Sequence, residues 1–165
     1  MTTTLYMAIS ADGFIAGPND ETPWSDESWD AFRKFVKSCD VVLLGRRTYE
    51  IMRDHNEFVD GPEYRVATDN EAFDTGTFGK LSIKTKADLP QVERLGVIGG
   101  GDLNGCLAEL NAFDEIILDV EAVALGSGTR LFGNHAARLN LELLESQKIG
   151  KGTLHNRYLV REGLS

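Results

Sequence analysis

The sequence predicts an α/β fold of three layers, in which helices cover both faces of a mostly parallel, twisted sheet that ends in an antiparallel hairpin. Apolar stretches typical of buried strands alternate with segments of helical periodicity along most of the chain. Two of these strands run directly into glycine turns before a helix, in "LLGRRTYE" and "VIGGGDLNG". The last third alternates apolar and polar residues on either side of "KIGKG", a pattern typical of a hairpin.

The first elements are a buried strand over residues 3–10 and a long loop over residues 11–24 that is rich in Gly, Pro and Asp. A loop of this length usually has a function, so we expect it to border a cleft above the sheet. Ser25 is the expected N-cap of the following helix, because Asp26 and Glu27 fall in its first turn and apolar residues recur on one face.

The remaining elements follow from the same signals. Strands are expected where short apolar runs lie between turn residues, over residues 41–44, 64–68, 78–83, 115–122 and 153–161. Helices are expected where the pattern is helical, over residues 48–53 and 103–110, and a polar helix is expected over residues 87–94. We expect residues 1–165 to form a single domain, since this length suffices for one substantial core.

Composition excludes several classes of partner. The formal net charge of −9 disfavours binding to nucleic acid or to an anionic membrane, because both are polyanions. The start of the chain lacks the pattern of a signal peptide, and no apolar run approaches the ~20 residues of a spanning helix, which indicates a cytoplasmic protein. The two cysteines and three histidines are scattered, so we expect no metal site.

Two segments carry the signal for anion binding. Arg46 and Arg47 follow a buried strand at the start of a helix, where guanidinium groups and free backbone amides together suit a phosphate. The alternative is that both arginines are solvated residues on a surface turn. The three glycines of "VIGGGDLNG" allow a second phosphate to approach the backbone at another helix start, although Asn104 departs from the dinucleotide fingerprint GxGxxG.

Two anion sites at one sheet edge suit a long molecule that carries several phosphates, and NADPH is the natural candidate. Its pyrophosphate would lie on the glycine turn and its ribose 2′-phosphate on the arginines. Asp119 lies about 20 residues beyond the glycine turn, where NAD-binding proteins place an acid on the ribose. It also fits the polar side of a strand, and the arginine pair favours the extra phosphate of NADPH.

Taken in order, "MAISADGFIAGPNDETPW", "VVLLGRRTYE" and "VIGGGDLNGCLAEL" with the following "FDEIILDVEAVALGSGTRLF" resemble the dihydrofolate reductase-like superfamily. Within it, the chain is similar to the reductases of the riboflavin-biosynthesis (RibD-type) C-terminal domain family. The resemblance covers nearly the whole chain and implies an NADPH-dependent reductase that acts on a small-molecule substrate and forms a homodimer. The implied cofactor-binding residues are Ala8, Ile15, Gly45, Arg46, Arg47, Thr48, Thr68, Gly100, Gly101, Asp102 and Leu103. The implied substrate-binding residues are Tyr6, Trp24, Phe32 and Ile98.

The catalytic acid is less well defined. Folate reductases carry an acid in the helix four residues before the matched Phe32, and Ser28 stands there in this chain. Asp26 and Glu27 just upstream are candidates for a catalytic role, with helix N-terminal charge compensation as the alternative. Asp12 in the long loop is a further candidate, with a turn-forming role before Gly13 as the alternative.

The leading predicted activity is hydride transfer from NADPH to a C=N or C=O carbon of a ribosylamino-pyrimidine, as in 5-amino-6-(5-phosphoribosylamino)uracil reductases. Dihydrofolate reduction is the second possibility. A non-catalytic NADPH-binding sensor and a flavodoxin-like flavin carrier are the alternatives from other classes.

Overall fold

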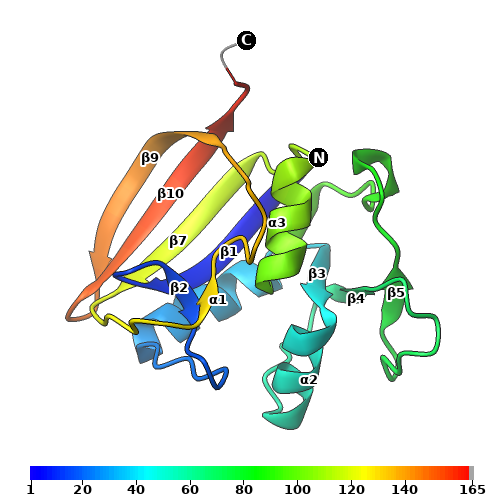
Figure 1. The fold of residues 1–165 in the computed structure, drawn as a ribbon, viewed down its shortest axis with the longest axis horizontal. Helices are drawn as coiled ribbons and strands as arrows, with labels where there is room; N and C mark the ends of the chain where they lie inside the picture. The colour runs from blue at the N-terminus through cyan, green and yellow to red at the C-terminus, as the bar shows by residue number, and fades with distance from the viewer. Residues whose placement is uncertain (164–165) are drawn as a thin grey trace.

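The computed structural model describes residues 1–163 and shows three layers (Figure 1). Over these residues the central sheet has eight strands, in the order β5-β4-β3-β6-β1-β7-β10-β9. The helices α1 (Asp26–Lys37) and α2 (Arg46–Asp54) pack on one face, and α3 (Gly101–Glu109) packs on the other. The predicted fold class is therefore confirmed.

The sheet is parallel from one edge to β7 and then ends in an antiparallel hairpin, as predicted. Its strands are β1 (Thr2–Ser10), β3 (Val41–Gly45), β4 (Glu63–Ala67), β5 (Gly79–Leu81), β6 (Arg94–Val97), β7 (Glu115–Glu121), β9 (Asn140–Ile149) and β10 (Thr153–Arg161). A second, small antiparallel sheet pairs β2 (Phe14–Ala16) with β8 (Thr129–Arg130). The long loop predicted after the first strand is therefore tied to the glycine-containing connection after β7.

The core divides between the two faces of the sheet. In β3, Val41 and Leu43 pack toward α3, whereas Val42 and Leu44 pack toward α1 and α2. Because successive side chains of a strand point to opposite faces, a central strand covered by helices on both sides must be apolar throughout. This explains the uninterrupted apolar run before Gly45.

One predicted helix and one predicted helix boundary are wrong. The polar helix predicted over residues 87–94 is only a short 3₁₀ turn, η1 (Lys86–Asp88), followed by extended backbone. Leu89 precedes Pro90 and is extended, since a residue before proline is disfavoured in the helical region. The helix predicted from residue 48 begins instead at Arg46 with Gly45 as its N-cap, so both arginines lie in its first turn.

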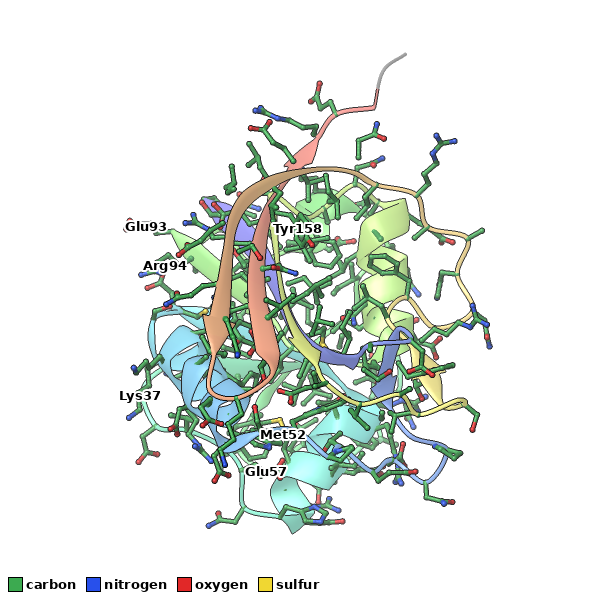
Figure 2. All side chains as sticks on the ribbon, turned by 90° about the vertical axis from the view of Figure 1, so that its left-hand side faces the viewer. Lys37, Met52, Glu57, Glu93, Arg94 and Tyr158 are labelled. Carbon is green, nitrogen blue, oxygen red and sulfur yellow. The ribbon has the colours of Figure 1, made fainter. Side chains whose placement is uncertain are left out.

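The hairpin of β9 and β10 forms one edge of the sheet, with α1 and α3 on opposite sides of it (Figure 2). β9 is exposed along almost its whole length. Tyr158 and Val160 of β10 pack against the core on the α3 side, whereas His155 contacts Asp119 and the ring of Tyr6.

Candidate functional site

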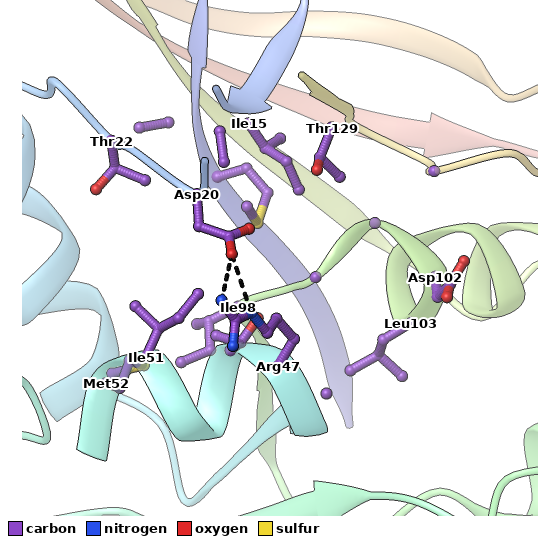
Figure 3. Close-up of a pocket in the computed structure, with 18 of the residues that line it drawn as sticks. Ile15, Asp20, Thr22, Arg47, Ile51, Met52, Ile98, Asp102, Leu103 and Thr129 are labelled. Carbon is purple, nitrogen blue, oxygen red and sulfur yellow. Dashed lines mark hydrogen bonds and ion pairs between the residues drawn. The ribbon is translucent and has the colours of Figure 1, made fainter. Parts of the chain in front are cut away.

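A cleft of about 800 Å³ lies beyond the carboxyl ends of β3 and β6 and against Tyr6, Met7 and Ala8 of β1. The chain from β2 to the start of α1 borders it on one side, and the first turns of α2 and α3 border it on the other (Figure 3). Ligands of open parallel sheets bind beyond the carboxyl ends of the strands, where helix N-termini also point. This cleft is therefore the candidate site.

The two glycine turns meet at the base of the cleft. β3 and β6 are neighbours in the sheet, and the backbone N–H of Gly45 donates to the carbonyl oxygen of Gly99 over 2.7 Å. Gly99 has φ +102°, a conformation that favours glycine. Gly45 and Gly100 are the N-caps of α2 and α3, and neither can offer a side chain to the first amides of its helix. Two helix N-termini without side-chain caps therefore face one cleft, and this arrangement fits a ligand with several phosphates.

The arginine pair lines the same cleft. Arg47 donates from Nε and Nη2 to Oδ2 of Asp20, over 3.0 and 2.6 Å, and this pair links the first turn of α2 to the long loop (Figure 3). The hydrogen bond to Asp20 raises the pKa of Arg47 above its ordinary value. The guanidinium carbon of Arg46 lies 5.9 Å from the centroid of the Phe73 ring. The residues present thus fit a phosphate, although Asp20 already engages one of the two cations.

The opposite wall of the cleft is aromatic and ends in a buried polar group. The ring of Tyr6 lies 5.8 Å from that of Phe32 and 5.0 Å from that of Phe35, measured between centroids. The Tyr6 hydroxyl donates to Asp119 of β7, which is 0% exposed. Ser28 of α1 also donates to this carboxylate, over 2.8 Å, and both Tyr6 and Ser28 line the cleft.

Most of the residues that the sequence predicted for the site lie together in the cleft lining. These are Tyr6, Ala8, Ile15, Trp24, Phe32, Gly45, Arg46, Arg47, Thr48, Ile98, Gly100, Gly101, Asp102 and Leu103. A Cβ built on Gly100 would lie 3.4 Å from Oγ1 of Thr48, so the threonine hydroxyl stands directly beside the glycine turn. The roles assigned to these residues stay predictions.

Four predicted residues are not part of the cleft lining: Asp12, Asp26, Glu27 and Thr68. Asp12 accepts hydrogen bonds from the backbone N–H groups of Leu125 and Gly126, over 3.0 and 2.7 Å. It also accepts one from the Ser10 hydroxyl, and these bonds lower the pKa of Asp12 to about 2. The carboxylate thus joins the turn before Gly13 to the loop after β7, which supports the alternative of a structural role at the turn.

Asp26 and Glu27 are exposed in the first turn of α1. A Cβ built on Gly150 would meet the carboxyl carbon of Glu27 at 2.5 Å, so Glu27 lies against the turn between β9 and β10. Their positions support helix charge compensation. Thr68 follows β4, and its hydroxyl accepts a hydrogen bond from the N–H of Asn70.

Sequence reasoning missed the group around Asp119. Asp119 was recognisable as an acid inside an apolar strand, but its partners Ser28 and His155 lie 91 and 36 residues away along the chain. Nothing in their local patterns connects them, because the contact depends on how α1, β7 and β10 pack.

The fold is that of the dihydrofolate reductases. The structure of the Enterococcus faecalis dihydrofolate reductase complexed with NADP(H) is similar with a TM-score of 0.76 at 17% identity, over 98% of this chain and 97% of that chain. A pyrimidine reductase-like protein from Corynebacterium diphtheriae is similar with a TM-score of 0.78 at 12% identity, over 98% and 92% of the two chains.

Within this class the chain resembles one family in particular. Residues 86–155 match the family model of the RibD C-terminal domain, a segment that includes the glycine turn, Asp119 and His155. The diaminohydroxyphosphoribosylaminopyrimidine deaminase/5-amino-6-(5-phosphoribosylamino)uracil reductase of Thermotoga maritima has a TM-score of 0.74 at 13% identity, over 97% of this chain and 56% of that chain. The uncharacterized protein YwjB of Bacillus subtilis (strain 168) is 27% identical over 161 residues, 90% of this chain and 92% of that protein. The resemblance predicted from the sequence is confirmed. Over residues 1–163, no helix combines the length and the apolar character needed to cross a membrane.

Proposed function

We propose that the protein is an NADPH-dependent reductase that transfers hydride to a C=N or C=O carbon of a small heterocyclic substrate. The leading substrate is 5-amino-6-(5-phosphoribosylamino)uracil, the compound in the name of the similar Thermotoga maritima reductase. The match to the RibD C-terminal domain and the similarity to an NADP(H)-binding fold both support this proposal.

One observation carries the proposal. A single cleft joins two helix N-termini and two arginines at one end to an aromatic wall around Tyr6 and Phe32 at the other. Phosphates favour the first end through charge and hydrogen bonds, and a flat heterocycle favours the second through ring contacts. A reductase needs both, because hydride donor and acceptor must be held against each other.

The chain's own residues take the following proposed roles. Gly45, Arg46, Arg47 and Thr48 would hold the adenosine-side phosphates of the cofactor, and Gly100, Gly101, Asp102 and Leu103 would receive its pyrophosphate. Thr68, outside the cleft lining, would lie near the adenine ribose. Ala8 and Ile15 would flank the nicotinamide, which supplies the hydride when NADPH is bound. Tyr6, Trp24, Phe32 and Ile98 would orient the substrate ring and exclude water from it.

Two alternatives have specific support. Dihydrofolate is a candidate because of the similarity to the Enterococcus faecalis enzyme, although Ser28 stands where the resemblance places an acid. A non-catalytic NADPH sensor is the other candidate, since Asp12, Asp26 and Glu27 do not line the cleft. The sensor would keep the phosphate end of the cleft and reduce nothing.

The test is binding and turnover with purified protein. NADPH binding is measured by titration, and NADPH oxidation is then followed with 5-amino-6-(5-phosphoribosylamino)uracil and with dihydrofolate in parallel. We expect oxidation with the first substrate and a stoichiometric reduced product. Binding without oxidation of NADPH by either substrate would favour the sensor. Failure to bind NADPH would overturn the proposal, and a yellow protein as purified would favour a flavin carrier.

A homodimer and a cytoplasmic location complete the proposal. The edge strand β9 exposes Leu141, Leu143 and Leu144 by 43%, 55% and 45%. Large apolar side chains gathered on an open sheet edge are a surface that a second copy of the chain would cover. The molar mass in solution, measured by light scattering, tests this directly.

A further inference from the structure

Asp119 is a buried carboxylate on which three donors converge from three different elements. Oδ2 accepts from the hydroxyls of Tyr6 in β1 and Ser28 in α1, and Oδ1 lies 2.6 Å from Nδ1 of His155 in β10. Asp119 is 0% exposed, and a buried charge is tolerated only when it is paired and hydrogen-bonded. Three donors meet that requirement.

The arrangement fixes which way the two hydroxyls point. A hydroxyl has a single proton and two lone pairs, so an oxygen that donates to Asp119 has only acceptor capacity left. Burial and the neighbouring Asp119 carboxylate raise the pKa of Tyr6 far above its ordinary value, which keeps its proton in place. Among residues 1–163, neither Tyr6 nor Ser28 has another hydrogen-bond partner for its hydroxyl, and both line the cleft.

The same wall lacks positive charge. The cationic side chains of the cleft lining are Arg46, Arg47 and Arg130 over the described residues, and they come from the first turn of α2 and from β8. The lining residues contributed by α1 are Ser28, Trp29 and Phe32, and those of β1 are Tyr6, Met7 and Ala8. A ligand group held between α1 and β1 therefore meets aromatic rings and two acceptor oxygens, and no cation.

We propose that Asp119 is a positioning residue that holds the hydroxyls of Tyr6 and Ser28 as hydrogen-bond acceptors, so that the α1 side of the cleft selects an uncharged ring presenting N–H donors. This positioning role rests on the proposed function in one respect, which is that the selected ring is the hydride acceptor. A lactam or aminopyrimidine edge has this chemistry, whereas a carboxylate or phosphate does not.

A purely structural role for Asp119 must be separated from this one, and the chain offers a matched control. Glu121 lies two residues further along β7 and is also buried, at 5% exposure. It accepts from the backbone N–H and the hydroxyl of Ser25, the N-cap of α1, and makes no hydrogen bond to Tyr6 or Ser28. Both acids thus anchor the start of α1 to β7, but only Asp119 controls the two hydroxyls.

The test measures a ratio of affinities with two probes, 5,6-diaminouracil and 5,6-diamino-1,3-dimethyluracil, which lacks the ring N–H donors. For the wild-type protein we expect 5,6-diaminouracil to bind about tenfold more tightly in an NMR titration. Asp119→Ala removes the shared acceptor, so that both hydroxyls are free to turn their protons toward the ligand. It should bring the ratio close to one, whereas Glu121→Gln should leave the ratio unchanged.

Ser28→Ala provides a second variant if Asp119→Ala does not fold, because it removes one acceptor and leaves the carboxylate with two donors. It should lower the ratio about threefold to fivefold. Equal ratios in wild type and Asp119→Ala, or an equal change in Glu121→Gln, would overturn the inference. NADPH titrations of the same samples keep the two proposals apart. If the wild-type protein does not bind NADPH, the proposed reductase function is refuted. The ratio of the two probe affinities still decides the role of Asp119.

Discussion

The backbone N–H of Gly45 donates to the carbonyl oxygen of Gly99 over 2.7 Å, which joins two glycine turns that lie 54 residues apart (99 − 45). The hydrogen bond fixes the end of β3 against the end of β6. The first turns of α2 and α3 consequently open onto the same cleft, and the two anion sites indicated by the sequence belong to one cavity. A ligand with several phosphates would contact both helix starts at once, with the arginines of α2 beside it.

Replacing Arg46 and Arg47 together with Ala should weaken NADPH binding about 10- to 100-fold and leave NADH binding nearly unchanged. Only NADPH carries a 2′-phosphate, and its charge-assisted hydrogen bonds to guanidinium groups would be lost. Both dissociation constants are measured by titration of the protein's fluorescence. Equal losses of affinity for NADPH and NADH would mean that the arginines bind the pyrophosphate, which both cofactors carry, or that they only pack against the loop.

Asp20→Asn should tighten NADPH binding a few-fold. Asp20 holds Arg47 through two hydrogen bonds, and a cofactor phosphate must compete with it for the guanidinium. The gain is small because an exposed ion pair contributes about 0–1 kcal/mol. Glu50→Gln is the matched control, since Glu50 lies 3.7 Å from Arg47 Nη1, beyond hydrogen-bond distance. Weaker NADPH binding by Asp20→Asn would instead show that the cofactor-bound protein needs the contact between Asp20 and Arg47.

The fold was largely predictable because the signals behind it are local. The apolar strand in "VVLLG", the N-cap Ser25 and the turn "KIGKG" each depend on neighbouring residues, and each lies where it was expected. The helix predicted over residues 87–94 does not form. Pro90 disfavours helical backbone at Leu89, and this restraint outweighs the helical pattern of the surrounding polar residues.

The site was predictable only where a motif marks it. The glycine turns and arginines follow strands of the sheet, so their position at one edge could be inferred from topology. The carboxylate at the other end of the cleft could not. Asp119 gains its partners from α1 and β10, and the sequence shows neither that these elements converge nor that Ser28 turns its hydroxyl toward β7.

Gly105→Ala should destabilise the protein by about 1–3 kcal/mol, although alanine is the better helix former. A Cβ at residue 105 would meet the carbonyl oxygen of Phe132 at 2.5 Å and the ring of His135 at 2.4 Å. The side chain of His135 can move, but the backbone at Phe132 cannot move far. Urea denaturation gives the difference in the free energy of unfolding. A gain in stability would show that the segment after β8 moves away from α3 at little cost.

His155→Gln should cost more stability at low pH than at high pH. The hydrogen bond to Asp119 raises the pKa of His155, with a smaller contribution from the negative charge of Glu145 and against the opposing effect of burial. A pKa that is higher in the folded state means that the protonated ring stabilises the fold. This stabilisation is fully present below the unfolded pKa of about 6.5 and is lost as the pH rises through the folded pKa.

The measurement is the free energy of unfolding of wild type and His155→Gln by urea denaturation from about pH 5.5 to about pH 9. Subtracting one curve from the other removes the titration of His55 and His135, which both proteins share. The difference should be largest at the acidic end and should shrink above about pH 6.5. A difference that grows with pH would mean that the neutral ring is the stabilising form, and that burial of His155 outweighs its hydrogen bond to Asp119.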